Sequence, residues 1–267
     1  MTLPEAIIIA VIEGLTEFLP VSSTGHMILA QALLGVPSSE FLKLYIVSIQ
    51  LGAILSVIVL YKRRFFKSTR FYLKLLAGFV PAAIIASALG DKIDAMLESP
   101  FIVALSLLIG GVFLLFVDKW FGSPQNKEAN EPEEPGYKQA LIIGLFQCIA
   151  LIPGVSRSAA TIVGGMAQKL TRKAAAEFSF FLAVPTMFAA TAKKTLDYSL
   201  AGLSLDSGQI RYLLVGNVVA FVVALLAIRL FIGYLQQYGF RVFGWYRIVV
   251  GIIILGMMSY GVDLSIV

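Results

Sequence analysis

The stretch that decides the fold reads Glu13-Gly-Leu-Thr-Glu17-Phe-Leu-Pro20-Val-Ser22-Ser23-Thr24-Gly25-His26, and it ends on the single histidine of the chain. It lies inside an apolar region, residues 4–34, that is long enough to enter a membrane. A charged group at bilayer depth costs roughly 2.5–3.5 kcal/mol on insertion scales. Carboxylates, hydroxyls and an imidazole in this setting therefore predict a functional site with partners nearby.

The composition is that of an all-α polytopic membrane protein, with residues 1–267 forming one integral membrane domain. Hydrophobic residues make up 58% of the 267 residues and charged residues 14%, whereas soluble proteins carry about 25% charged residues. The net charge of +5 is explained by a basic cytoplasmic side, and no basic stripe or aromatic platform indicates nucleic acid as a partner. One cysteine and one histidine exclude internal disulfides and multi-histidine or cysteine metal centres.

Six apolar stretches are close to the ~20 residues that a full transmembrane helix needs. They are residues 45–61, 75–90, 101–117, 176–192, 212–230 and 244–262. Two further apolar regions, 4–34 and 139–170, are interrupted by Pro20–Gly25 and Pro153–Ser158. Neither half of these regions spans a bilayer comfortably, so each predicts a re-entrant helix-loop-helix pair. Such a loop is tolerated at depth only where it lines a cavity or is buried in protein.

The two halves of the chain resemble each other. Pro20-Val-Ser22-Ser23 matches Pro153-Gly-Val-Ser156-Arg157, and Leu75–Gly78 matches Leu213–Gly216. We therefore predict a first repeat over 1–122, a polar linker without chemistry over 123–136, and a second repeat over 137–267. Each repeat holds one re-entrant pair and three spans. Because three is odd, the second copy should be inserted upside down, as in inverted-topology repeats.

The distribution of basic residues orients the chain. The loop 62–74 is the densest basic segment and should face the cytoplasm. Alternation of the six spans then places 118–138 and 229–247 on the same side, which carries 15 of the 21 Lys and Arg residues. Both termini are predicted to be extracytoplasmic.

The first broken region offers acid–base chemistry. Glu13 and Glu17 share one helix face, and two like charges in apolar surroundings need a cation, a metal or a shared proton. His26 follows the break by about one helical turn, which suits a general base or a nucleophile. Hydroxyls beside it can bind an anion at the start of the second half-helix, or cap that helix; they belong to Ser22, Ser23 and Thr24.

The second broken region, Pro153–Thr161, predicts an anion site. Gly154 lets the backbone approach a ligand, and Arg157 is a forked, permanently charged donor suited to phosphate. Arg157 should pair with Glu13 or Glu17, await a phosphate, or do both in turn. Further hydroxyl donors are Ser156, Ser158 and Thr161. If the repeats bring both loops together, an arginine–hydroxyl cradle faces an acid–base set, as phosphoryl transfer requires. A substrate arriving through lipid would be a lipid-linked phosphate or diphosphate.

At these residues the sequence resembles the undecaprenyl-diphosphate phosphatase family, also called the bacitracin-resistance protein family. The resemblance covers essentially the whole chain and includes Ile49–Gly52 and Ala176–Pro185. It implies a hydrolase of the bacterial inner (plasma) membrane that converts undecaprenyl diphosphate to undecaprenyl phosphate and inorganic phosphate. This reaction recycles the lipid carrier for peptidoglycan and cell-wall synthesis and confers bacitracin resistance. The resemblance further implies an active site open to the extracytoplasmic side and a divalent cation, Mg²⁺ or Ca²⁺.

The resemblance and the residue chemistry assign roles together. The expected catalytic residues are Glu17, Ser23, His26 and Arg157. The expected diphosphate-binding residues are Ser22, Thr24, Gly154, Ser156, Arg157, Ser158 and Thr161, and the expected cation ligands are Glu13 and Glu17. Two attacks remain open: Ser23 activated by the His26–Glu17 pair, or His26 activating water or accepting the phosphoryl group itself.

Other functions fit the pattern less well. A polyprenyl-phosphate flippase or transporter would also use inverted repeats with broken helices, but carriage alone needs no nucleophile. Lipid phosphatases that use two histidines are excluded by the single histidine. A structural scaffold would not need these polar residues at depth. Besides a polyprenyl diphosphate and membrane lipid, a second copy of the chain is a possible partner, through the glycine-containing span 244–261.

Overall fold

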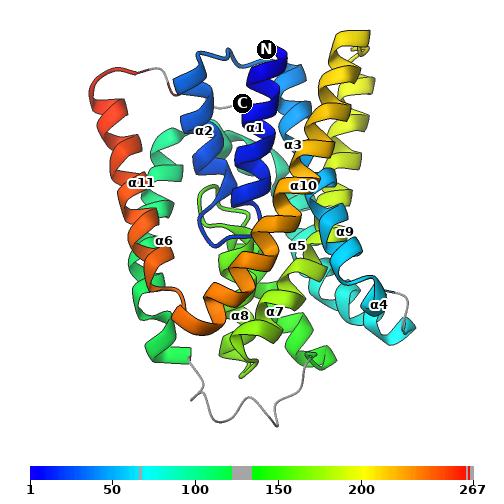
Figure 1. Cartoon of the computed structure of the whole chain (residues 1–267), viewed down its shortest axis with the longest axis vertical. Helices are drawn as coiled ribbons and strands as arrows, with labels where there is room; N and C mark the ends of the chain where they lie inside the picture. The colour runs from blue at the N-terminus through cyan, green and yellow to red at the C-terminus, as the bar shows by residue number, and fades with distance from the viewer. Residues whose placement is uncertain (66–67, 122–133, 263, 265–267) are drawn as a thin grey trace.

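The computed structural model describes residues 1–65, 68–121, 134–262 and 264, and every regular element among them is a helix (Figure 1). Six helices are long and apolar enough to cross a membrane, as predicted. They are α3 (Glu40–Leu60), α5 (Thr69–Leu97), α6 (Pro100–Phe121), α9 (Arg172–Leu200), α10 (Ser207–Tyr238) and α11 (Arg241–Ser259). Residues 123–133 of the predicted linker lie outside the described residues.

The long helices extend beyond the predicted apolar windows at most of their ends. Residues 75–90, for example, are the centre of α5, which runs from Thr69 to Leu97. Hydropathy detects only the apolar part of a helix, whereas the helical backbone hydrogen bonds continue into polar residues at its ends. A short helix, α4 (Lys62–Phe65), was not predicted and lies in the basic loop. Beside this loop, Glu134 accepts from Arg64 at 2.7 Å and Lys74 at 3.2 Å, so it joins the start of the second half to the first.

The two broken regions form pairs of short helices. The first pair is α1 (Leu3–Thr16, 14 residues) and α2 (Ser23–Leu34, 12 residues). The second pair is α7 (Tyr137–Ile149, 13 residues) and α8 (Arg157–Ala167, 11 residues). At about 1.5 Å per residue none of these helices reaches across a hydrocarbon core of about 30 Å. Figure 1 shows α1 and α2 at the end of the bundle that holds the N-terminus, and α7 and α8 toward the opposite end.

The turns of the two hairpins meet in the bundle. The hydroxyl of Ser158 at the start of α8 donates to the backbone oxygen of Leu19 in the first turn at 2.7 Å. Both breaks lie a few residues earlier than predicted, at 17–22 and 150–156, because Ser23–Gly25 and Arg157–Ser158 already form the first turns of α2 and α8.

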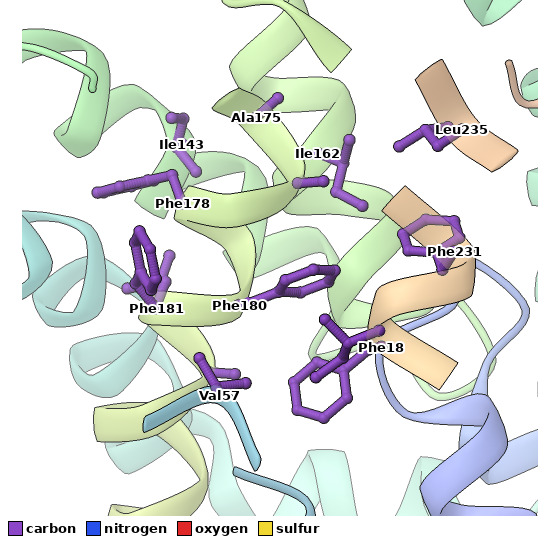
Figure 2. Packing of buried hydrophobic residues seen from close by; sticks show 14 of the residues in the cluster. Phe18, Val57, Ile143, Ile162, Ala175, Phe178, Phe180, Phe181, Phe231 and Leu235 are labelled. Atoms are coloured by element: carbon purple, nitrogen blue, oxygen red, sulfur yellow. The ribbon is translucent and has the colours of Figure 1, made fainter. Parts of the chain in front are cut away.

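A cluster of aromatic side chains packs against the first turn. Phe18 is fully buried and packs edge-on against Phe180 of α9, with ring centroids 5.2 Å apart. Phe180 in turn contacts Phe231 of α10, and Figure 2 shows these three rings together. Because Phe18 directly follows Glu17 in the chain, this packing also fixes the position of the Glu17 backbone, from which the carboxylate extends.

Glycines let α6 and α11 approach closely. A Cβ at Gly111 would lie 2.8 Å from the backbone oxygen of Gly244, and a Cβ at Gly251 would lie 3.0 Å from the backbone oxygen of Ala104. The predicted partner-facing glycines of span 244–261 are thus used partly within the same chain. A homodimer remains a prediction.

Candidate active site

A buried ion pair joins the two sequence motifs. Arg157 Nη2 lies 3.0 Å from Glu17 Oε1, with side-chain exposures of 11% and 5%. The other terminal nitrogen of Arg157 donates to the backbone oxygen of Ser179 at 2.9 Å and to its hydroxyl at 3.2 Å. Of the partners expected for Arg157, the structure selects Glu17. Because both ends of the guanidinium are held, its position is fixed before any ligand binds.

The second oxygen of Glu17 accepts a hydrogen bond from Ser23, one of the candidate nucleophiles that the sequence left open. Ser23 Oγ donates to Glu17 Oε2 at 2.8 Å, so one carboxylate connects a hydroxyl and a guanidinium. Ser23 lies in the first turn of α2, where backbone N–H groups lack helical partners and favour an anion. The three side chains can therefore bind a phosphate and activate a hydroxyl next to it.

These groups lie at the inner end of a cavity of about 650 Å³. Its wall contains most of the predicted site residues, namely Glu13, Glu17, Ser22, Ser23, Thr24, Gly154, Ser156 and Arg157. Farther out it is lined by charged residues near the start of α3 and the ends of α5 and α9, including Lys43, Glu98 and Lys194. The cavity therefore extends from the two turns toward the end of the bundle that holds the N-terminus.

Glu13 is buried, and its carboxylate lacks a hydrogen-bond donor among the described residues. Its side chain is 0% exposed, and neither carboxylate oxygen accepts a hydrogen bond within the described part of the chain. Gln31 of α2 lines the same cavity, is 4% exposed and leaves both amide atoms unpaired. A buried carboxylate without a donor is costly unless a cation or a polar ligand satisfies it. These two residues therefore make the inner cavity suited to a charged, polar ligand.

Both turns contain a strained serine at the same place. Ser22 and Ser156 precede α2 and α8 and have φ values of 69° and 76°, in the region that favours glycine. Such backbone costs on the order of 1–3 kcal/mol and concentrates at functional sites. Ser156 caps α8 by accepting from the Ala159 N–H at 3.3 Å, whereas the Ser22 hydroxyl makes no such bond. Capping of α2, one of the two roles considered for Ser22, is therefore absent, whereas the cap that Ser156 gives α8 was not predicted.

Ser158, Thr161 and His26 do not line the cavity. Ser158 bonds to Leu19, and Thr161 bonds to the Ser179 hydroxyl at 2.6 Å. One ring nitrogen of His26 lies 2.7 Å from the backbone oxygen of Ser22, and the other lies 2.7 Å from the Tyr246 hydroxyl. His26 makes no hydrogen bond to Arg157 or Glu17. These three residues hold the turns and Ser179 in place around the cavity-lining groups.

Comparison with known proteins assigns the chain to a family. A family model described as bacitracin resistance protein BacA matches residues 6–253, a range that includes both motifs. The chain belongs to this family. An undecaprenyl-diphosphatase of Flavobacterium johnsoniae is 60% identical over 251 residues, which cover 94% of each chain. An undecaprenyl-diphosphatase of Porphyromonas gingivalis is 51% identical over the full length of both chains, and one of Aquifex aeolicus is 41% identical over 254 residues.

In this chain of the BacA family, the sequence interpretation missed one buried cation. Arg247 of α11 is 0% exposed, although its position near a helix start led us to count it with the cytoplasmic residues. Its guanidinium donates to the backbone oxygens of Gly154 and Val155 in the second turn, both at 2.8 Å, and to Pro20 in the first turn at 3.4 Å. A further bond of 3.1 Å reaches Ser106 of α6. The count of basic residues should therefore exclude Arg247, which is a central tie between the turns.

Two further residues of the site had weaker signals. Ser179 belongs to a stretch that carries the family resemblance, but only the fold shows that it contacts Arg157 and Thr161. Tyr246 directly precedes Arg247 and stacks on His26, with ring centroids 5.5 Å apart and planes 6° from parallel. The available signal was that Tyr246 and Arg247 are polar residues within the apolar span 244–262, since polar groups in such a span require partners.

Proposed function

We infer that this chain hydrolyses undecaprenyl diphosphate to undecaprenyl phosphate and inorganic phosphate. The deciding observation is the Arg157–Glu17–Ser23 array at the inner end of a cavity, built from both motifs of a family whose relatives are named undecaprenyl-diphosphatases. This activity regenerates the lipid carrier for cell-wall synthesis and lowers the amount of diphosphate available to bacitracin. The direct test measures free phosphate released from undecaprenyl diphosphate by the purified chain in detergent; a chain that binds the lipid without releasing phosphate would contradict the inference.

The membrane arrangement is a further part of this proposal. We place the chain in the bacterial inner membrane, with α1–α2 and α7–α8 as re-entrant hairpins of two inverted repeats. The support comes from their short helices, their meeting turns and the matching strained serines. The basic segment 62–74 then faces the cytoplasm, so both termini and the open end of the cavity face the opposite side. Cysteine labelling at Thr2 and at Arg63 in intact cells should modify only the former with an impermeant reagent.

The reaction uses groups that already touch one another. As the diphosphate enters, Arg157 exchanges its bond to Glu17 for the terminal phosphate. Glu17 accepts the proton of Ser23 Oγ, which bonds to the terminal phosphorus while the bond from phosphorus to the bridging oxygen breaks. Undecaprenyl phosphate leaves with that oxygen and its electron pair. Water then attacks the phosphorus of the phosphoserine while the bond from phosphorus to Oγ breaks, and Glu17 returns its proton to Oγ. Inorganic phosphate leaves with the oxygen and the protons of that water, which restores the Ser23 hydroxyl and the Glu17 carboxylate. Backbone N–H groups at the starts of α2 and α8 stabilise the added negative charge.

Ser23 rather than His26 meets the phosphorus in this scheme, because Ser23 lines the cavity and both ring nitrogens of His26 are occupied. Ser23→Ala should lower the rate of phosphate release by about 10³-fold or more. His26→Gln and Tyr246→Phe should lower it only on the order of tenfold, as expected for one lost positioning bond. Trapping with labelled substrate should place phosphate on Ser23. Label on His26, or a His26→Gln rate as low as that of Ser23→Ala, would assign the attack to the imidazole.

A divalent cation fits the carboxylates of α1. Glu13 offers two unpaired oxygens one helical turn from Glu17, and the described residues contain no group of three or more His, Cys, Asp and Glu side chains that would form a complete metal site. Mg²⁺ is commonly held by one or two carboxylates together with substrate phosphates. When bound, such an ion would neutralise charge on the diphosphate.

Chelation should therefore abolish phosphate release, and added Mg²⁺ or Ca²⁺ should restore it. Glu13→Gln keeps the shape of the side chain but removes a charged ligand, so it should raise the cation concentration needed for half-maximal activity by at least about tenfold. The matched control is Glu5→Gln, at the start of the same helix. Full activity of the parent chain in excess chelator would remove the cation from the proposal.

Transport without hydrolysis is the second candidate that the sequence left open. The Ser23–Glu17 bond favours hydrolysis over this alternative, because carriage does not need a hydroxyl held by a carboxylate. The phosphate-release assay separates the two functions directly.

A further inference from the structure

A second hollow, of about 580 Å³, lies at the end of the bundle opposite the N-terminus. It is formed where the ends of α6 and α10 meet the beginnings of α9 and α11, and Figure 1 shows α11 beginning there. Cationic residues in its wall are Lys119, Arg172 and Arg241, and the single carboxylate is Asp118. None of these residues belongs to the active site described above.

The charges of this hollow are only partly balanced. Asp118 accepts from Arg172 at 3.0 Å through one oxygen and from the backbone N–H of Phe240 at 2.7 Å through the other. This carboxylate therefore neutralises Arg172 and fixes the turn between α10 and α11. Lys119 and Arg241 are exposed and have no ion pair among the residues that the structure describes. Within the described residues, two positive charges beside the hollow therefore have no carboxylate partner.

The position of the hollow suits the boundary between membrane and water. Lys119 lies close to the end of α6, and Arg241 is the first residue of α11, a helix that can span the membrane. Aromatic side chains flank them: Trp245 is 54% exposed and Tyr238 is 59% exposed, and both line the hollow. The other tryptophan of the chain, Trp120, follows Lys119 directly. Tryptophan and tyrosine concentrate at the headgroup level of bilayers.

We propose that this hollow binds the phosphate headgroup of an anionic phospholipid. Lys119 and Arg241 would take the phosphodiester, while Trp245 and Tyr238 would contact the glycerol and upper acyl region. Basic pockets between transmembrane helices are a recurrent form of lipid recognition. A freely dissolved anion would gain the same charge interaction but would leave the exposed aromatic wall without a partner, and this favours the lipid.

The test uses fluorescence from one tryptophan. Trp120→Phe leaves Trp245 as the sole tryptophan, because the chain contains two. This parent is reconstituted into vesicles that contain equal amounts of phosphatidylglycerol and phosphatidylcholine, with bromine placed close to the headgroup of one or the other lipid. Brominated phosphatidylglycerol should quench Trp245 with an apparent association constant at least about fivefold higher than brominated phosphatidylcholine. Adding Lys119→Gln and Arg241→Gln together should bring the ratio close to one.

The matched control is Arg63→Gln with Arg229→Gln, two exposed cations outside the hollow, and it should keep the parent's ratio. Thermal unfolding midpoints check that each variant is folded. If the double variant does not fold, high salt should lower the parent's ratio instead, since exposed charges are screened. Equal quenching by both lipids in the parent would overturn the proposal. An unchanged ratio in the folded double variant would also overturn it. Loss of the preference when millimolar inorganic phosphate replaces chloride at constant ionic strength would overturn it too, because that result would indicate a site for dissolved anions.

Discussion

Arg157→Ala should lower phosphate release by at least about 10³-fold, the scale seen when an arginine that stabilises a transferring phosphoryl group is removed. Arg157 is the cation at the inner end of the cavity, and it contacts Glu17 at 3.0 Å and Ser179 at 2.9 Å. The other cations of the cavity wall, Lys43, Lys193 and Lys194, lie near the ends of α3 and α9. They are too far along their helices to replace a guanidinium between the two turns.

Arg157→Lys separates charge from geometry. A lysine keeps the positive charge but cannot donate in a planar fork to Glu17 and Ser179 at once, so we expect a loss of about 10²-fold. Arg157→Ala also leaves the buried Glu17 carboxylate without its cation, which destabilises the fold. The double variant Arg157→Ala, Glu17→Gln should recover thermal stability but not activity. Phosphate release by Arg157→Ala within a factor of a few of the parent would contradict the proposed cradle.

Arg247→Met should destabilise the protein by about 3–5 kcal/mol, because four backbone oxygens lose a charged donor. These oxygens belong to Pro20, Ser106, Gly154 and Val155. Pro20 lies in the first turn, and Gly154 and Val155 lie in the second turn. Replacing a buried ion pair by apolar residues is often harmless because both charges disappear. Here the partners are peptide oxygens that remain, so the cost is not cancelled. We expect the thermal unfolding midpoint to fall by roughly 10 °C.

Arg229→Met is the matched control, since Arg229 is exposed on α10 and the same change there should alter stability by less than about 0.5 kcal/mol. Arg247→Met should also reduce phosphate release, because Gly154 and Pro20 belong to the turns that carry the reacting groups. If this variant does not fold, Arg247→Lys should give an intermediate unfolding midpoint, as one ammonium can serve only some of the oxygens. An unchanged midpoint in Arg247→Met would show that the turns hold themselves without the guanidinium.

Several features followed from local sequence. The six spans appear as continuous apolar runs, because lipid selects for them regardless of how the helices pack. The interruptions at Pro20 and Pro153 were also visible in the sequence, since proline and glycine disrupt a helix and hydroxyl residues interrupt an apolar run. Charge alone predicted that Arg157 needs an anionic partner, because an unpaired guanidinium in apolar surroundings is costly, but it left open a carboxylate of the first motif, a phosphate, or both in turn. The structure confirms the six long apolar helices and both interruptions, and it selects Glu17 from the partners left open for Arg157.

Other features needed the packed structure. Whether a polar side chain faces the cavity depends on how its helix is rotated, and two residues of one motif can face opposite ways. Arg157 lines the cavity while the adjacent Ser158 turns to Leu19. His26 likewise turns to Tyr246, a residue 220 positions away in sequence. Arg247 looked like the solvated start of a helix, since hydropathy records how apolar a segment is but not which side chains point inward.

The sequence by itself therefore determined which six segments are apolar enough to cross a membrane, which two apolar regions are interrupted, and which charges in those regions need partners, because hydropathy is a property of each segment. Only the tertiary structure decided which hydroxyl meets Glu17, which cation ties the turns together and where the cavity opens. Those outcomes depend on helix rotation and crossing distance, which are set by contacts such as Gly111 against Gly244 between segments far apart in the chain.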